Sequence, residues 1–241
     1  MNELIDKIEE LQDLASINYL ERRAAADESI ELYQEAESLE VYRIRIATDA
    51  LLVQLGMVGH GNNIKEPNDE NSYQVNLLCS FIQTHYCINN LILESHLVEA
   101  VTLIRKQLEA LTRLNELDKK SVSKVQGKTP NIQNQLGQSY VDVYRPLSEV
   151  AHFSTPRVNE LLSFDEFPDG EWGPSVFQYY HEKSHQYYLV HWSLTCKFVY
   201  WFLGKVGEWY DQISVENEKE LFAQILTAAN SAGLFNEDES Q

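Results

Sequence analysis

The residue types best suited to chemistry lie between Tyr144 and Ser154, in a segment that reads YRPLSEVAHFS. Arg145 and His152 are seven residues apart, so on a helix they fall on nearly the same face, about 20° apart after two turns. Arginine binds phosphate, and histidine transfers protons near neutral pH. Such a pair is sufficient for metal-free RNA cleavage, in which the ribose 2′-hydroxyl attacks the neighbouring phosphorus.

Other polar side chains would support this pair if two helices pack together. They are Tyr144, Ser148 and Glu149 from the same segment, and Arg105 and Glu109 from the earlier segment Glu99 to Leu117, which reads EAVTLIRKQLEALTRLNEL. Pro146 suits the first position of a helix, which predicts that Arg145 lies just outside it. A structural role is the alternative: His152 would cap and pack, Ser148 would bond to backbone, and Arg105 would pair with Glu109.

The spacing Arg-x6-His in RPLSEVAH, placed after a long amphipathic helix with LIRKQLEALTRL, resembles the HEPN superfamily of all-helical proteins. The resemblance covers roughly residues 71–210 and is greatest to prokaryotic members of unassigned function. It implies a homodimer that cuts RNA without metal or cofactor, in a toxin or antiviral setting. By position it implies that Arg145 binds phosphate and His152 is the acid or base. Arg105 and Glu109 would be supporting residues.

A second motif, HEKSH, spans His181 to His185 and matches the HExxH pattern of zinc peptidases. His191 falls at the third-ligand spacing of the metzincins, but Tyr188 replaces the glycine that ends the helix in that pattern. On a continuous helix His191 lies about 9 Å along the axis from His185, too far to share one zinc ion. We therefore reject a metal site at His181, Glu182 and His185. These histidines would instead face solvent or a partner.

The net charge of −18 is concentrated at the two ends of the chain. Residues 1–40 hold 12 acidic and 3 basic residues, and residues 208–241 hold 8 and 1. In contrast, Arg105 to Lys128 holds 7 basic and 3 acidic residues, so a local basic surface could lie beside the candidate pair. That run indicates either a solvated helix end and loop or a nucleic-acid surface.

Several features favour a cytoplasmic protein with no membrane association. The start, MNELIDKIEE, lacks the apolar run of a secretory signal. The most apolar stretch, Tyr187 to Val206, contains His191 and Lys197, which is typical of a buried helix. The cysteines are odd in number and show no CxxC spacing, so we expect a reducing compartment.

Apolar residues at helical spacing predict an all-α fold, a helical bundle with a HEPN-like core. The helices are expected in two long runs before Gly56, from about Asn71 with a pause at Asn89 and Asn90, over 94–119, as a short helix that starts at Pro146, and over 176–210 and 216–229. Residues 121–139 are expected to form a loop with one helical turn, and a small β-hairpin near 160–175 would turn at Asp169 and Gly170.

We divide the chain into an acidic helical arm (residues 1–60), packed on or continuous with a core (71–210), and a C-terminal helix with an acidic tail (211–241). The acidic arm and the aromatic residues of 176–210 support a second functional hypothesis, a non-catalytic helical module that binds a protein partner or assembles it. The expected partners are thus a second copy of the chain and either RNA or another protein.

Overall fold

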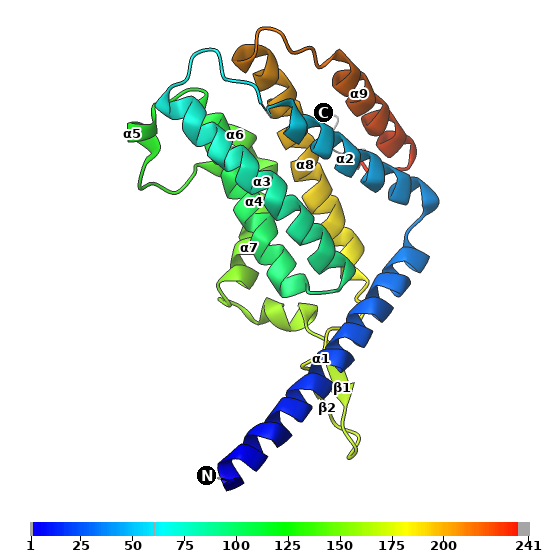
Figure 1. The fold of residues 1–241 in the computed structure, drawn as a ribbon. Coiled ribbons are helices and arrows are strands. Elements are labelled where there is room, and N and C mark those ends of the chain that lie inside the picture. Colours follow the sequence, from blue (N-terminus) through cyan, green and yellow to red (C-terminus); the bar gives the residue numbers. More distant parts are fainter. Residues whose placement is uncertain (1, 60, 236–241) are drawn as a thin grey trace.

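The computed structural model describes residues 2–59 and 61–235, so the end of the expected acidic tail, 236–241, lies outside the described residues. The fold is an all-α bundle with one small hairpin, as the sequence predicts (Figure 1). The elements are α1 (Asn2–Ala36), α2 (Leu39–Val58), α3 (Asp69–Leu93), α4 (Leu97–Leu117), α5 (Val122–Val125), α6 (Ile132–Leu136), α7 (Gln138–Ala151), the 3-10 helix η1 (Pro156–Leu161), β1 (Phe164–Glu166), β2 (Trp172–Pro174), α8 (Lys183–Trp209) and α9 (Glu216–Ser231).

Helix α4 lies at the centre of the bundle and contacts α3, α7 and α8, while α2 packs against α9 (Figure 1). Its apolar side chains recur every three or four residues and are all buried, as their periodicity predicts: Leu97, Val101, Ile104, Leu108, Leu111 and Leu114. The polar residues Arg105 and Glu109 stand one turn apart beside this apolar face. A rigid, central helix therefore fixes the position of both.

Helix α3 runs through Asn89 and Asn90, so the expected pause there is wrong. The side-chain amide of Asn89 donates to both carboxylate oxygens of Asp49, at 3.1 and 3.3 Å. Because the amide has these partners on α2, it does not compete with the helical hydrogen bonds of its own backbone. The break comes instead at Ser95, whose positive φ of 58° separates α3 from α4.

Helix α7 begins at Gln138, so the expectation that Pro146 starts a short helix is also wrong. Gly137, with a φ of 96°, provides the preceding break, and Leu147 and Val150 are buried residues of α7, which packs against α4. The helix contains Pro146 in its interior because the ring fixes a helical φ, and the carbonyl that lacks a partner belongs to exposed Asp142. Arg145 is therefore inside the helix. The chain before α7 forms two short helices, α5 and α6, where one turn was expected.

The hairpin pairs β1 with β2 in antiparallel register, with Asp165 opposite Gly173. Its turn falls at Asp169 and Gly170, as predicted, because Gly170 adopts a φ of 83° and Asp169 Oδ1 accepts a hydrogen bond from the Glu171 amide. Helix α8 begins at Lys183, seven residues later than expected. The preceding residues follow the hairpin instead, and the Tyr179 amide donates to Ser163 Oγ.

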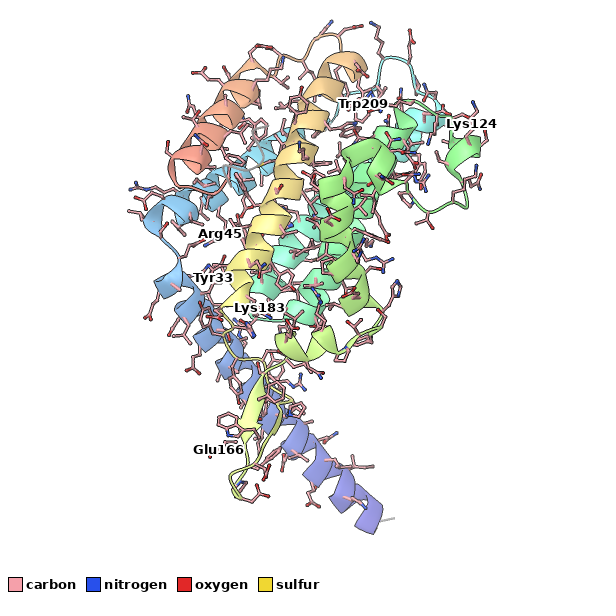
Figure 2. The ribbon with its side chains drawn as sticks, turned by 180° about the vertical axis from the view of Figure 1, so that it is seen from behind. Tyr33, Arg45, Lys124, Glu166, Lys183 and Trp209 are labelled. Carbon is pink, nitrogen blue, oxygen red and sulfur yellow. The ribbon has the colours of Figure 1, made fainter. Side chains whose placement is uncertain are left out.

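Helix α1 joins the bundle only through its last third, where Ala25, Ser29 and Tyr33 are buried. The rest of α1 extends past the bundle beside the hairpin (Figures 1 and 2). Tyr33 stacks on His185 of α8, with ring centroids 4.2 Å apart. Among the described residues, none of the helices has both the length and the apolar character needed to cross a membrane.

Candidate functional site

Helices α4 and α7 pack side by side and bring four polar side chains into one connected group. Arg105 and Glu109 come from α4, Tyr144 comes from α7, and His152 is the residue that ends α7. We call this group the Arg105 cluster. Its members are among the residues that the sequence singled out, although the sequence paired Arg145, and not Arg105, with His152.

The guanidinium of Arg105 connects the cluster. Its Nε and Nη2 donate to the Tyr144 hydroxyl at 3.2 and 3.1 Å, and Nη2 lies 3.0 Å from Glu109 Oε1. Its Nη1 lies 2.7 Å from His152 Nε2. The Tyr144 hydroxyl in turn donates to Glu109 Oε1 at 2.8 Å. The Arg105–Glu109 pair of the structural alternative is thus present, but it is one part of a larger arrangement.

The contact with Arg105 fixes the role of each nitrogen of His152. Because a guanidinium only donates, His152 Nε2 accepts, so Nε2 carries the lone pair and Nδ1 carries the proton of the neutral ring. The residue is exposed at the end of α7, while Arg105, Glu109 and Tyr144 are partly buried. An unprotonated ring nitrogen therefore lies next to a cation at a place that solvent reaches.

The surroundings keep Tyr144 neutral and Arg105 charged. Burial raises the pKa of Tyr144, and its hydrogen bond to Glu109 raises this pKa further. For Arg105, burial acts to lower the pKa, but the hydrogen bond to Tyr144 and the charge of Glu109 outweigh it, and the pKa is raised. At neutral pH Tyr144 is therefore a neutral phenol and Arg105 a cation.

The three remaining candidates on α7 do not join the cluster. Arg145 is exposed and, within the described residues, makes no hydrogen bond or ion pair. Glu149 pairs with Arg157 of η1 at 3.2 Å, a contact that the sequence did not indicate. Ser148 accepts a hydrogen bond from the His152 amide through its carbonyl, at 3.1 Å. Arg145 is thus a cation with unused donors on the helix that ends at His152.

Phe153 is a feature of this site that sequence reasoning missed. It follows His152 directly, is 68% exposed, and adopts a φ of 50°. A non-glycine residue with positive φ is uncommon, and a bulky one is an outlier. The motif YRPLSEVAHFS contains Phe153, but residue type alone gives no sign of this backbone conformation.

The HEKSH motif does not form a helical metal site. His181 and Glu182 precede α8, and His181 Nδ1 accepts a hydrogen bond from the Lys183 amide at 3.1 Å. His185 stacks on Tyr33, and buried His191 lies 2.8 Å from Gln107 through Nδ1. Among the described residues, no group of three or more His, Cys, Asp or Glu side chains could hold a metal ion.

A second polar group lies inside the bundle, between α2, α3 and α8. His85 Nε2 is 2.7 Å from Asp49 Oδ1, and His85 Nδ1 is 3.1 Å from Thr195 Oγ1. Asn89 donates to the same Asp49 carboxylate. We call these four residues the Asp49 network. His85 and Thr195 are fully buried, whereas the Asp49 side chain is 24% exposed.

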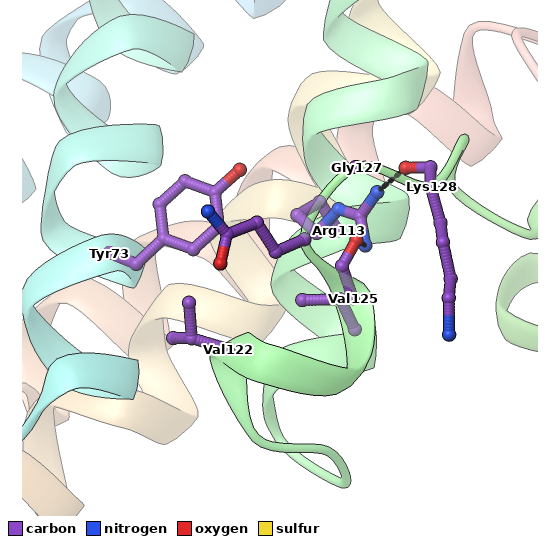
Figure 3. Close-up of a pocket in the computed structure, with 7 residues that line it drawn as sticks. Tyr73, Arg113, Val122, Val125, Gly127 and Lys128 are labelled. Atoms are coloured by element: carbon purple, nitrogen blue, oxygen red, sulfur yellow. Dashed lines mark hydrogen bonds between the residues drawn. The ribbon is translucent and has the colours of Figure 1, made fainter.

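A pocket of about 400 Å³ lies at the C-terminal end of the basic run, and Tyr73, Arg113 and Lys128 are among the residues that line it (Figure 3). Buried Arg113 donates to the carbonyls of Val125 and Lys128 and pairs with Glu116 at 2.8 Å. Its donors therefore hold the loop that closes the pocket. Within the basic run, this use of Arg113 is a structural role and not a contact available to nucleic acid.

No protein-family model matches the chain, and neither the curated proteins nor the solved structures contain a match.

Proposed function

We propose that the chain is a metal-independent endoribonuclease and that the Arg105 cluster, with Arg145, is its active site. One observation carries the proposal: exposed His152 presents an unprotonated Nε2 at 2.7 Å from Arg105 Nη1. Arg145, a cation without a partner among the described residues, stands on the same helix. A general base beside one guanidinium group, with a second arginine on the same helix, suits a phosphodiester, which needs a proton acceptor and stabilisation of negative charge.

The chemistry follows from competition for Arg105. A bound phosphate is a stronger acceptor for a guanidinium than a neutral imidazole, so Arg105 and Arg145 would turn to the phosphate oxygens. His152 Nε2 is then free to take the proton of the ribose 2′-hydroxyl. The 2′-oxygen forms a bond to phosphorus, the bond to the 5′-oxygen breaks, and the leaving oxygen takes a proton from water. Protonated His152 then gives its proton to the hydroxide that remains, which restores the neutral ring. The products are a 2′,3′-cyclic phosphate and a 5′-hydroxyl.

Tyr144 and Glu109 act as positioning residues in this scheme. Tyr144 accepts two hydrogen bonds from Arg105 and donates one to Glu109, so the guanidinium plane is held from one side. Arg105 also lies over the Tyr144 ring, with its central carbon 5.3 Å from the ring centroid. Arg105 therefore has a defined orientation before any phosphate binds.

The direct test is cleavage of single-stranded RNA by the full chain in EDTA. We expect 2′,3′-cyclic phosphate ends, and we expect His152→Ala to lower the rate by roughly 10²- to 10⁴-fold, as for loss of a general base. The control variant His96→Ala, which removes a partly exposed histidine just before α4, should cut RNA at the wild-type rate. Intact RNA with the wild type, or equal cutting by His152→Ala, would refute the proposal.

The HEPN resemblance supports the proposal of a toxin or phage-defence setting for this activity. Induced expression of the wild type should then slow growth and degrade cellular RNA, because an unrestrained ribonuclease consumes its substrate. His152→Ala should do neither at the same protein level. Equal toxicity of the two proteins would separate any growth effect from the Arg105 cluster.

A second candidate function, self-assembly through α1, is favoured by the exposure of residues 7–24. Every side chain from Lys7 to Ala24 is exposed except half-buried Asn18. Large apolar side chains lie among them: Ile8, Leu11, Leu14, Ile17, Tyr19 and Leu20, each 46–67% exposed. Helices draw most of their stability from packing, and exposed apolar patches mark interaction surfaces. We therefore infer that a partner covers this part of α1.

The charges favour a second copy of the chain, paired antiparallel about Leu14. Lys7, Leu14 and Glu21 are each seven residues apart, so they share one side of the helix. Antiparallel pairing sets Leu14 of each copy against the other and Lys7 of each copy level with Glu21 of the other. Neither Lys7 nor Glu21 makes an ion pair within the described residues. Leu11 and Ile17, which flank Leu14 on this side, would supply the apolar contacts.

Sedimentation of the purified chain tests this second function. We expect a dimer, which Leu14→Asp dissociates and Lys7→Glu weakens. Adding Glu21→Lys to Lys7→Glu restores the opposite charges and should recover the dimer, whereas Glu9→Lys, on the opposite side of the helix, should leave it unchanged. A wild-type monomer at tens of micromolar, or no recovery in the double variant, would contradict the antiparallel arrangement.

A further inference from the structure

Phe153 occupies a backbone position that normally belongs to glycine. Its amide donates to the Val150 carbonyl and the Ser154 amide donates to the Glu149 carbonyl, both at 3.1 Å. These are the hydrogen bonds of a helix C-cap in which the chain passes through the left-handed region, where glycine is preferred. With a φ of 50°, Phe153 bears a steric cost of about 1–2 kcal/mol that glycine would avoid.

Packing does not compensate this cost. Phe153 is 68% exposed and lies outside the hydrophobic core and the residues packed against it. Within the described residues, its ring makes no contact with another aromatic ring. A strained residue whose side chain adds nothing to the core points to a function for that side chain.

We propose that Phe153 is a stacking platform for one nucleobase of a single-stranded RNA whose phosphate binds at Arg105 and Arg145; this inference rests on the proposed ribonuclease function. Consecutive Cα atoms are about 3.8 Å apart, so a nucleotide bound at His152 is within reach of the next residue's side chain. The αL conformation turns the chain at the end of α7 and leaves the ring of Phe153 exposed to solvent.

The chemistry of the ring defines the substrate class. Phenylalanine has no hydrogen-bonding group, and every base has a π-face, so stacking on Phe153 is tolerant of sequence. Bases in a duplex are already stacked on their neighbours, and side chains therefore reach unpaired bases. The site should bind unpaired RNA, in loops, bulges or single strands, and discriminate little among the four bases.

Binding of a short single-stranded RNA, with 2′-deoxy substitution to prevent cleavage, tests the inference by fluorescence anisotropy. Phe153→Ala should weaken binding by roughly 5- to 150-fold, the usual loss for one stacked base, and Phe153→Trp should retain or increase it. An abasic residue moved along the oligonucleotide should weaken wild-type binding at one position. At that position the Phe153→Ala variant should not distinguish the abasic from the normal RNA.

Stability provides the second readout, because a structural role and a binding role predict opposite results. Phe153→Gly should raise the midpoint of thermal unfolding, since glycine adopts this φ without strain, while weakening RNA binding as much as Phe153→Ala. Lower stability of Phe153→Gly would overturn the inference. So would equal RNA binding by the wild type and Phe153→Ala.

The outcomes separate this inference from the proposed function. If the wild type cuts RNA but Phe153→Ala binds and cuts equally well, the stacking role fails and the ribonuclease stands. If Phe153→Ala loses affinity for RNA that the wild type binds without cutting, stacking stands and catalysis fails. If the wild type does not bind RNA at all, both fail.

Discussion

The Arg105 cluster and the Asp49 network are built from similar groups and differ in access. Each joins a carboxylate, a histidine and a hydroxyl across packed helices. In the Asp49 network the order is carboxylate, imidazole, hydroxyl, with contacts of 2.7 and 3.1 Å, which is the order of a hydrolase triad. On distances alone it would be the better candidate for catalysis.

Burial decides against that interpretation. Thr195 is fully buried, and its hydroxyl donates to the His191 carbonyl at 3.0 Å, so no substrate reaches it and its one proton is already used. In the Arg105 cluster His152 is exposed, and Arg145 nearby in the chain has donors to spare. A buried polar group whose hydrogen bonds are made within the protein, such as the Thr195 hydroxyl, stabilises the fold. Catalysis needs a solvent-accessible group with a donor or acceptor that is still free to bind substrate.

The largest expected difference between the two regions is in stability. His85→Ala removes one of the two buried partners of Asp49, and leaving the partly buried carboxylate with Asn89 alone should lower the free energy of unfolding by about 2–4 kcal/mol. His152→Ala, at an exposed helix end, should change it by less than about 1 kcal/mol. Urea unfolding followed by circular dichroism measures both.

A double variant shows whether the cost comes from the orphaned charge. Replacing Asp49 and His85 together by leucine removes both partners and should recover much of the stability lost in His85→Ala. If His85→Ala and His152→Ala cost the same, the Asp49 network is not a structural element and the comparison fails.

Local sequence patterns predicted the parts of this molecule that depend on local physics. The periodicity of α4 indicated which of its faces is buried, and the spacing of Arg105 and Glu109 indicated their pairing. Asp169 and Gly170 indicated the hairpin turn, because few residues adopt the backbone conformation it needs.

The parts that failed depend on tertiary contacts. Asn89 remains helical because Asp49 of α2 receives its amide, and Pro146 remains inside α7 because that helix packs on α4 through Leu147 and Val150. For the same reason, His152 contacts Arg105 of α4 and not Arg145 of its own helix. Which arginine meets a histidine on another helix is set by how the two helices pack, and spacing within one helix does not contain that information.

The pH dependence of stability sharpens the comparison at His191, beside the Asp49 network. Burial, and then the nearby His85, holds the pKa of His191 well below its usual value. Its Nδ1 faces Gln107, and its buried Nε2 has no hydrogen-bond partner within the described residues, so a proton there would be unpaired. The folded protein therefore keeps His191 neutral in a pH range where the unfolded chain protonates it.

The unfolded state then binds more protons, so stability falls as pH decreases below about 6.5, by up to about 1.4 kcal/mol per pH unit from this residue. His181 and His185, whose pKa values burial also lowers, add to the wild-type slope. His191→Gln keeps a donor for Gln107 and should reduce the slope of stability against pH by up to about 1.4 kcal/mol per pH unit, the value for one proton. Urea midpoints measured between pH 7.5 and 5.5 test this, and an unchanged slope would mean that folded His191 accepts a proton.

The smallest expected effect distinguishes positioning from catalysis within the Arg105 cluster. Tyr144→Phe removes the hydroxyl that accepts from Arg105 and donates to Glu109, while the ring under the guanidinium and the Arg105–Glu109 pair remain. The loss in unfolding free energy should be about 0.5–1.5 kcal/mol, because these groups are only partly buried.

RNA cleavage by Tyr144→Phe should fall far less than in His152→Ala, since Tyr144 orients Arg105 and transfers no proton. Rates measured across pH should keep the wild-type profile in Tyr144→Phe. A loss as large as that of His152→Ala, with an altered profile, would make the Tyr144 hydroxyl a proton donor in the reaction and not a support for Arg105.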